Sequence, residues 1–537
     1  MPYQLTLQPV LERAVQLAEH QTVISRDADG LRRLTYGHLA RRISRLVTLL
    51  GEFGCRPKDS IASLAWNHQR HLQLYFGVPL AGCVLHLVNP SLSKDQLVYV
   101  INDAQDKVLF VDDEFVPLVE DILPRIPFVQ HIVTLSGQQK TSQRSSGIYD
   151  ELLDQMPEGK WSAFIREMDA ATMCYTSATT GRPKGVVYTH RMLYLHSLAL
   201  GTVDSLGINR DDTVMPVVPM YHVHAWGLPF AATWFGARQV LPGPHPRAST
   251  IVDLIEQEAV TVTAAVPTVW FDVAQELQER PRSLTSLRMV LNGGSAVPLR
   301  TLKQYWEEFH LPMVHAYGLT ETTPVVTVSH LRQAHHRLTP DQRFRIQERQ
   351  GVVVAGLQWR VVGNDGVDVP WDDSTLGELW VKGPWVATAY YRGQVSEDEW
   401  LHTGDMVRVD QEGYLEIVDR RQDLIKSGGE WISSIALEHA LMGHFQVQEA
   451  AVIGATDARW GERPVACIVP VSVAEEEESL CAGLRHFLQQ SDAFPAWWIP
   501  DTFAVLDAIP RGATGKFDKA ALRRQCASGS LRLTSVP

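Results

Sequence analysis

The sequence predicts an α/β protein in which a large N-terminal domain of layered α/β subdomains is followed by a small α+β domain. From about residue 60 to 300, short apolar runs such as 61–66 and 84–88 alternate with helical patterns such as 94–104. This alternation is typical of a parallel sheet covered by helices. Between about 351 and 419 the apolar runs are closely spaced and separated by turn residues, which predicts a β-rich subdomain.

The last part of the chain has a pattern of its own. A helix is expected near 433–442, strands near 447–453 and 464–471, and a second helix near 479–491. These elements predict a separate C-terminal α+β domain of about 115 residues, which is an ordinary domain size.

The charge balance argues against one broad class of function. The 537 residues include 49 Lys and Arg against 61 Asp and Glu, which gives a net charge of −12. Such a chain has no overall positive field to attract polyanions, so we do not expect a nucleic-acid partner. A phosphate-bearing ligand must instead be held by a local site of backbone N–H groups, hydroxyls and a few cations.

Cysteine usage and the N-terminal sequence predict a reduced, cytoplasmic protein. None of the six cysteines forms a Cys-x-x-Cys pair, and the first residues lack the pattern of a signal peptide. The longest uncharged stretch, 213–237, is interrupted by Pro216, Pro219 and Pro229. It therefore predicts a buried strand, loop and helix, and no membrane span.

The segment from Tyr175 to Gly185 combines hydroxyl side chains, glycines and cations after an apolar run. Glycine lets backbone N–H groups turn toward a ligand, hydroxyls donate further hydrogen bonds, and Lys184 supplies a mobile positive charge. The segment predicts a polyphosphate site, although Pro183 excludes a Walker A loop and composition alone also fits a polar surface loop. The residues expected to bind are Thr176, Ser177, Thr179, Thr180, Gly181 and Lys184.

This segment resembles the phosphate-binding loop of the adenylate-forming superfamily, which includes acyl-CoA synthetases, luciferases and peptide-synthetase adenylation domains. The family loop is usually written T-S-G-T-T-G-x-P-K-G, and Ala178 replaces its third residue. Further segments resemble family signatures in the same order, so the resemblance extends from about residue 35 to 520. They are Met220–Trp226, Tyr317–Glu321, Thr403–Asp405, Asp419–Trp431 and Pro510–Lys516.

The resemblance implies activation of a carboxylic acid by ATP, with attack of the carboxylate on the α-phosphate and departure of pyrophosphate. That step needs alignment and charge stabilisation. Glu321 is implied to hold Mg²⁺, Thr320 to donate to the α-phosphate, and Lys516 to bridge the carboxylate and the phosphate. The implied catalytic residues are Lys516, Thr320, Glu321 and His222.

The resemblance also implies contacts with the nucleoside. Tyr317, followed by Gly318, is expected to stack on adenine, and the carboxylate of Asp405 and the guanidinium of Arg420 are expected to bind the ribose hydroxyls. A glycine-rich segment is expected to allow close backbone approach beside the base or the acyl group. Its residues are Gly293, Gly294 and Ser295.

The family hinge falls on Gln422. The resemblance therefore implies an N-terminal adenylation domain at 1–421, whose β-rich subdomain spans about 351–421, and a C-terminal lid domain at 422–537. Rotation of the lid about the hinge would remove Lys516 from the site before the second step.

Within the superfamily, the sequence is most similar to medium- and long-chain fatty acyl-CoA synthetases. Trp226 is implied to gate an acyl tunnel, although an aromatic anchor in the core is the alternative reading. The wall of a coenzyme A channel is implied for Gly428, Gly429 and Trp431. We therefore expect a cytoplasmic fatty acid–CoA ligase that uses ATP, Mg²⁺ and coenzyme A, and the resemblance suggests a homodimer.

Two other functions stay open. An amide ligase, which passes the acyl-adenylate to an amino acid or amine, is favoured by departures from the usual family pattern. These departures are Ala178, His224, Gln422 and Gly512. The third reading is a non-catalytic protein that binds ATP or an acyl-adenylate. The residues that argue against it are Lys184, Glu321, Asp405, Arg420 and Lys516.

Overall fold

The computed structural model describes residues 3–27, 29–135, 137, 144–161, 165–176, 182–393, 398–472, 476–491, 494–511 and 517–536. The chain consists of two compact units. The first unit contains residues 1–176, 183–359 and 381–401, and the second contains residues 177–182, 360–380 and 402–537. The predicted domain boundary between residues 421 and 422 stays a prediction.

A seven-stranded sheet lies in the first unit, with the strand order β7-β6-β5-β3-β4-β8-β9. All neighbouring strands run parallel except β8 and β9, which form an antiparallel hairpin at one edge. The central strands are buried along their whole length, as expected when helices cover both faces of a parallel sheet. The strands are β3 (Ser60–Leu64), β4 (Val84–Leu87), β5 (Val108–Val111), β6 (His131–Thr134), β7 (Ser145–Ile148), β8 (Ala170–Tyr175) and β9 (Gly185–Thr189).

The first unit also contains a nine-stranded sheet, with the order β16-β15-β14-β13-β12-β10-β11-β1-β2. Its strands β10 to β14 are parallel neighbours, whereas β15, β16 and β2 add antiparallel edges. The first strand of the chain pairs in parallel with β11, so that Val23 lies opposite Gln239. The strands are β1 (Thr22–Asp27), β2 (Gly30–Thr35), β10 (Thr213–Pro216), β11 (Arg238–Leu241), β12 (Val262–Ala265), β13 (Met289–Asn292), β14 (Met313–Gly318), β15 (Val325–Val328) and β16 (Val352–Val353).

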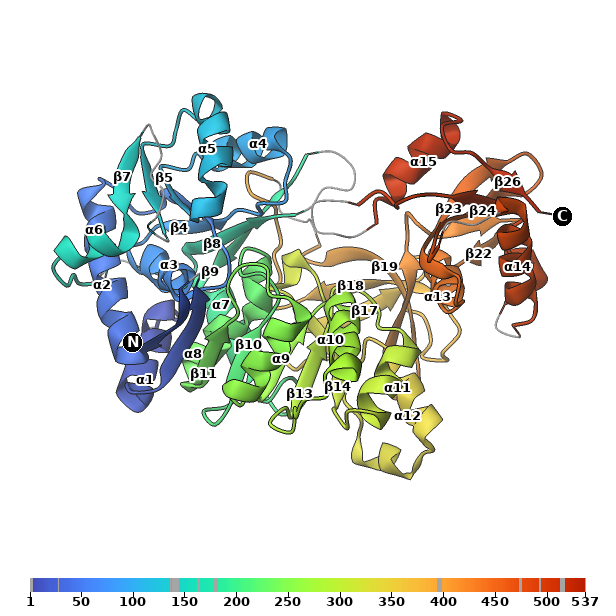
Figure 1. The fold of residues 1–537 in the computed structure, drawn as a ribbon, viewed down its shortest axis with the longest axis horizontal. Helices are drawn as coiled ribbons and strands as arrows, with labels where there is room; N and C mark the ends of the chain where they lie inside the picture. Colours follow the sequence, from blue (N-terminus) through green and yellow to red (C-terminus); the bar gives the residue numbers. More distant parts are fainter. Residues whose placement is uncertain are drawn as a thin grey trace. The chain divides into compact units, whose positions relative to one another are not determined.

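Helices of the first unit connect the strands, and α9, α10 and α11 lie along the nine-stranded sheet (Figure 1). A capping box at Ser93 and Gln96 starts α4, and Gly236 in the left-handed region ends α8. The helices are α1 (Leu7–Ala18), α2 (Tyr36–Glu52), α3 (Gln69–Leu80), α4 (Lys94–Ala104), α5 (Val116–Ile122), α6 (Tyr149–Gln155), α7 (His190–Leu200), α8 (Leu228–Phe235), α9 (Ala248–Gln257), α10 (Pro267–Glu279), α11 (Leu299–Glu307) and α12 (Pro340–Glu348). None of the helices among the described residues is both long and apolar enough to span a membrane.

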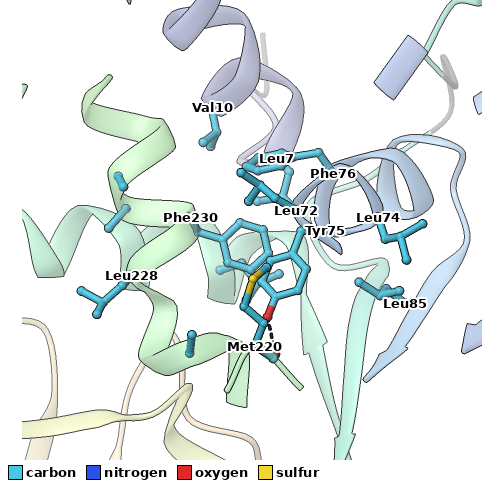
Figure 2. Packing of buried hydrophobic residues seen from close by; sticks show 14 of the residues in the cluster. Leu7, Val10, Leu72, Leu74, Tyr75, Phe76, Leu85, Met220, Leu228 and Phe230 are labelled. Atoms are coloured by element: carbon cyan, nitrogen blue, oxygen red, sulfur yellow. Dashed lines mark hydrogen bonds between the residues drawn. The ribbon is translucent and has the colours of Figure 1, made fainter. Parts of the chain in front are cut away.

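The main core joins the seven-stranded sheet to the nine-stranded sheet, and α3 lies entirely within it. Figure 2 shows Tyr75 of α3 beside Phe230 of α8 and Met220, with Leu7 of α1 nearby. The Tyr75 hydroxyl donates a hydrogen bond to the Met220 carbonyl, which satisfies the one polar atom of a buried aromatic ring. This core fixes the start of the chain segment that carries His222 and Trp226.

The second unit contains a four-stranded sheet and a six-stranded sheet. In the four-stranded sheet, β19 and the edge strand β20 are antiparallel. The elements predicted after residue 430 are found as α13, β23, β24 and α14, and the closely spaced strands predicted before residue 420 are found as β17 to β20. The predicted α/β fold class is therefore confirmed. The elements are β17 (Gln358–Val362), β18 (Gly377–Lys382), β19 (Leu401–Val409), β20 (Leu415–Arg420), β21 (Ile425–Ser427), β22 (Glu430–Ile432), α13 (Ser434–Met442), β23 (Val447–Asp457), β24 (Gly461–Pro470), α14 (Glu477–Gln489), β25 (Thr502–Val505), α15 (Lys519–Ala527) and β26 (Thr534–Ser535).

Candidate functional site

The predicted phosphate loop connects β8 to β9. Tyr175 and Gly185 lie opposite each other at the end of this hairpin, and the Thr176 amide donates to the Lys184 carbonyl at 2.9 Å. Lys184 is exposed. The hairpin therefore holds the two ends of the loop together. Four of the predicted phosphate ligands lie outside the described residues: Ser177, Thr179, Thr180 and Gly181.

Thr320 and Glu321 lie in η4 (Thr320–Thr322), just after β14. Two hydrogen bonds fix their backbone: the Tyr188 hydroxyl donates to the Thr320 carbonyl at 2.7 Å, and the Ala387 amide donates to the Glu321 carbonyl at 2.7 Å. Gly318 is required before this turn, because a Cβ atom there would lie 2.0 Å from the carbonyl oxygen of Pro324.

Tyr390 connects Lys184 with Glu321. The Lys184 Nζ atom lies 4.8 Å from the centre of the Tyr390 ring, and the Tyr390 hydroxyl donates to Glu321 Oε1 at 2.7 Å. Burial and the adjacent Glu321 carboxylate raise the pKa of Tyr390 above its ordinary value, so the hydroxyl keeps its proton. Our sequence prediction missed this residue, because only the tyrosine pair Tyr390-Tyr391 marks it and no spacing rule relates it to either partner.

The donor set near Glu321 suits a magnesium ion that is bound mainly by a substrate. Within the described part of the chain, no cluster of three or more His, Cys, Asp or Glu side chains could hold a metal ion. The single carboxylate of Glu321 fits Mg²⁺, which keeps several waters and commonly binds through one or two carboxylates together with phosphate oxygens. Tyr317, which lies half-buried at the end of β14, belongs to the same part of the unit.

Trp226 lies in a turn with an unusual backbone. Every residue from Val223 to Gly227 has a positive φ, from 35° at Val223 to 77° at Gly227. Four of these residues are not glycine, and such conformations are held only when the surrounding structure determines them strongly. The turn lies between β10 and α8, so the predicted strand, loop and helix of residues 213–237 are confirmed.

The structure brings Trp226 together with the predicted glycine segment. A Cβ atom at Gly293 would lie 3.0 Å from Cη2 of Trp226 and 2.9 Å from the carbonyl oxygen of Ala316. Trp226 is 7% exposed, whereas Gly294 and Ser295 are exposed. The indole ring therefore packs on a backbone that only glycine permits at this distance, beside residues that are open to solvent.

The two histidines of this turn lie in different environments. His222 is half-buried just before the turn. His224 is fully buried, its Nε2 atom lies 2.6 Å from the Thr172 hydroxyl, and its ring lies 4.6 Å from the ring of Tyr188. Burial lowers the pKa of His224 to about 3, helped by neighbouring histidines, so its imidazole is neutral.

In the second unit, the two predicted ribose ligands face each other. Asp405 of β19 and Arg420 of β20 are cross-strand partners, and Arg420 Nε lies 3.3 Å from Asp405 Oδ1. The Asp405 side chain is 4% exposed and that of Arg420 is 42% exposed. The pair therefore presents a buried carboxylate beside a guanidinium that reaches solvent, which suits recognition of paired hydroxyls.

The predicted hinge and channel residues lie close together in sequence after β20. Gln422 is exposed in the turn where the Asp423 amide donates to the Arg420 carbonyl. Gly428 and Gly429, with φ of 62° and 94°, form the tight turn between β21 and β22, and Trp431 follows in β22. Lys516 lies outside the described residues, as does Gly512.

A buried charged network lies directly before Arg420, and no local pattern in the sequence predicted it. Asp419 accepts hydrogen bonds from the amide and the hydroxyl of Ser434, and Lys519 Nζ lies 2.7 Å from Glu438 Oε1. The Lys519 ammonium also donates to the Ser434 hydroxyl at 2.7 Å. The network therefore ties the end of β20 to α13 and α15.

Known proteins match the chain along its whole length. The model of the AMP-binding enzyme family matches residues 11–391, and that of the AMP-binding enzyme C-terminal domain matches residues 436–516. The chain is 42% identical to the long-chain-fatty-acid–CoA ligase of Thermus thermophilus, over 98% of this chain and 96% of the relative. It is 38% identical to the 3-methylmercaptopropionyl-CoA ligase of Ruegeria lacuscaerulensis, over 97% of each chain.

A solved structure also resembles the chain along its length. It is that of the anthranilate CoA ligase AuaEII in complex with anthranoyl-AMP, with a TM-score of 0.86, 25% identity and coverage of 99% of both chains. The predicted resemblance is thus confirmed by sequence and by fold. The chain belongs to the AMP-binding enzyme family, that is, to the adenylate-forming superfamily.

Proposed function

We propose that the chain is an ATP-dependent, AMP-forming ligase that converts a carboxylic acid into its acyl-CoA thioester. The observation that carries the proposal is the contact series from Lys184 through Tyr390 to Glu321, beside the hairpin that holds the phosphate loop. It presents a cation and a carboxylate on one small area of a single unit. A magnesium–triphosphate needs both, because the lysine pairs with phosphate oxygens and the carboxylate with the metal.

In the first step an oxygen of the acid attacks the α-phosphorus of ATP, an O–P bond forms, and pyrophosphate leaves with the bonding electrons. Lys184 pairs with the outer phosphates, and the Thr320 hydroxyl donates to the α-phosphate. Glu321 would hold Mg²⁺, which supplies positive charge against the polyphosphate when bound. Fixed donors of this kind stabilise charge without reorganisation during the reaction.

The residues proposed to bind the ribose are Asp405 and Arg420. Asp405 accepts hydrogen bonds from the ribose hydroxyls and Arg420 approaches the same sugar. In the second step the sulfur of coenzyme A attacks the acyl carbonyl, a thioester forms, and AMP leaves. We propose that Lys516 assists the first step and that a lid domain at 422–537 then rotates about Gln422.

The acceptor channel and the acyl path are also proposals. Gly428, Gly429 and Trp431 would line the path of the pantetheine arm. Two relatives are named for long-chain fatty acids and for 3-methylmercaptopropionate, which are both aliphatic. The indole of Trp226, packed on Gly293, is an apolar surface suited to such a chain. We therefore propose an aliphatic acid as the substrate, with Trp226 beside it.

An amide ligase is the second candidate, in which an amine attacks the same adenylate. It is favoured by the departures at Ala178, His224, Gln422 and Gly512. A homodimer and a cytoplasmic location also remain proposals.

The deciding experiment is acid-dependent release of pyrophosphate from ATP, measured with linear, branched and cyclic acids. Coenzyme A, an amino acid or neither is added, and products are identified by mass spectrometry. We expect an acyl-CoA from a linear acid. An amide as the main product would move the chain to the amide ligases, and no pyrophosphate release with any acid would favour a nucleotide-binding protein.

A further inference from the structure

The segment from Trp385 to Arg392, here called the strap, bonds to both sheets of the first unit. On one side the Tyr391 amide donates to the Gly185 carbonyl at 2.6 Å, and Tyr390 forms an antiparallel bridge with Val186 of β9. On the other side the Ala387 amide donates to the Glu321 carbonyl at 2.7 Å. The strap therefore sets the spacing between the end of the phosphate loop and η4.

Further contacts fix both ends of the strap. The Thr323 hydroxyl donates to the Trp385 carbonyl at 2.6 Å, and the Trp385 indole N–H donates to the Val325 carbonyl at 3.2 Å. At the other end, Arg392 lies 3.8 Å from Asp103 Oδ1. Several hydrogen bonds and an ion pair thus anchor the strap to the rest of the first unit. They fix the backbone from which the Tyr390 ring extends.

The Tyr390 side chain uses its ring and its hydroxyl for two different partners. The ring face attracts the Lys184 ammonium, and the hydroxyl donates to the Glu321 carboxylate. The two opposite charges are thus held on either side of one rigid group. A hydrogen bond to a metal-binding carboxylate fixes which oxygen faces the metal, and loss of such a bond commonly lowers metal affinity by about 10–100-fold.

We propose that Tyr390 is a positioning residue that holds Lys184 and Glu321 at the separation needed to bind the two parts of one magnesium–triphosphate. This inference rests on the proposed function, since it assumes that Lys184 binds phosphate and Glu321 binds Mg²⁺. It assigns two separable tasks to one side chain: the hydroxyl orients the carboxylate for the metal, and the ring holds the lysine for the phosphates.

The test compares three variants. Tyr390→Phe keeps the ring and removes the hydroxyl, and Tyr390→Leu removes both. Tyr391→Phe is the matched control, because it removes the same hydroxyl from the next residue of the strap, whose ring lies 5.0 Å from the Arg392 guanidinium. Calorimetry measures the affinity for ATP without acid, once with Mg²⁺ and once with a chelator, so this readout does not depend on turnover.

The useful quantity is the affinity for ATP with Mg²⁺ divided by the affinity for ATP in chelator. We expect Tyr390→Phe to reduce this ratio by about tenfold, and to leave the affinity in chelator within about twofold of that of the wild type. The Mg²⁺ concentration for half-maximal pyrophosphate release should rise by a similar factor. Tyr390→Leu should in addition weaken ATP binding in chelator by about two- to fivefold, because the lysine loses its ring contact. Tyr391→Phe should match the wild type in every measurement.

Two results would overturn the inference. The first is an affinity ratio that is the same in the wild type and in Tyr390→Phe. The second is an equal loss in Tyr390→Phe and Tyr391→Phe that follows their melting temperatures, since that would reduce Tyr390 to a packing role. A wild type that binds magnesium–ATP but releases no pyrophosphate with any acid would contradict the proposed function alone, and the binding comparison would still decide the role of Tyr390.

Discussion

The contact between Gly293 and Trp226 leads to a quantitative prediction about substrate selection. Substitution of Gly293 by alanine adds a Cβ atom 3.0 Å from Trp226 Cη2 and 2.9 Å from the Ala316 carbonyl oxygen. Ordinary van der Waals contact begins at 3.4 Å, so both contacts are too short by about half an ångström and each must be relieved. The indole ring can move by rotation, whereas the Ala316 carbonyl belongs to β14 and is held by the sheet.

Overpacking of this size costs about 1–3 kcal/mol. If the cost falls on the substrate complex, kcat/KM for the preferred acid decreases by about 5- to 150-fold. The loss should differ between short and long acids, because displacement of Trp226 changes the space beside the acyl chain. Gly51→Ala is the matched control, since a Cβ atom there has nothing within 4 Å and α2 tolerates alanine.

The assay is a double-mutant cycle in which Gly293→Ala, Trp226→Ala and the combined variant are compared by pyrophosphate release with short, medium and long linear acids. Removal of the indole relieves one of the two close contacts of the new methyl group. We therefore expect the combined variant to be less impaired than the two single effects predict, with a coupling energy of about 1 kcal/mol or more.

Strict additivity of the two substitutions with every acid would refute this reasoning, because it would mean that the new methyl group does not act through Trp226. An unchanged ratio of kcat/KM between short and long acids in Gly293→Ala would likewise refute the placement of Trp226 beside the acyl chain.

Three further predictions concern other parts of the chain. Asp405→Asn should raise the KM for ATP by about tenfold or more, measured by initial rates, because a charged acceptor is lost; an unchanged KM would remove the ribose role. Burial raises the pKa of Glu438 from 4.5 to about 7, although the adjacent Lys519 opposes the shift. The protonated carboxyl group therefore stabilises the fold fully below pH 4.5, and this stabilisation is lost as the pH rises through about 7. Thermal melting of Glu438→Gln should lack this decline, and a wild-type melting temperature that is constant over this range would contradict the assignment. His224→Asn should lower the melting temperature by the equivalent of about 1–3 kcal/mol, because the smaller side chain leaves a void beside Tyr188, whereas an unchanged melting temperature would show that the site repacks without cost.

Local sequence patterns were sufficient to predict the fold class. Apolar runs of strand length that alternate with helical periodicity predicted the parallel sheets, and the change to closely spaced strands predicted β17 to β20. The pairing of β1 with β11 was not predictable in this way, since nothing in either strand encodes a partner so far along the chain. Strand order depends on the packing of whole layers, which short sequence windows do not contain.

The candidate site, too, was predictable from the sequence only in part. Family motifs identified Lys184, Glu321 and Asp405, which occur in segments of recognisable composition. Tyr390 was missed because its two partners lie 69 and more positions away, and its role exists only once the strap has bonded to both sheets. Lys519 was missed for a related reason: its two carboxylate neighbours are brought to it by β20 and α13.

The pairing of β1 with β11 has a consequence for biosynthesis. Val23 leaves the ribosome roughly 200 residues before its partner Gln239, which corresponds to about 10–40 s at ordinary rates of translation. During that time the hairpin of β1 and β2 has an unpaired apolar edge. Leu7 and Val10 of α1 are also not yet covered, because α8, which packs against α1, is synthesised later. Nascent chains shorter than about 240 residues should therefore be clients of chaperones that bind exposed strands, and slower translation of this region should increase aggregation more than slower translation of the second unit.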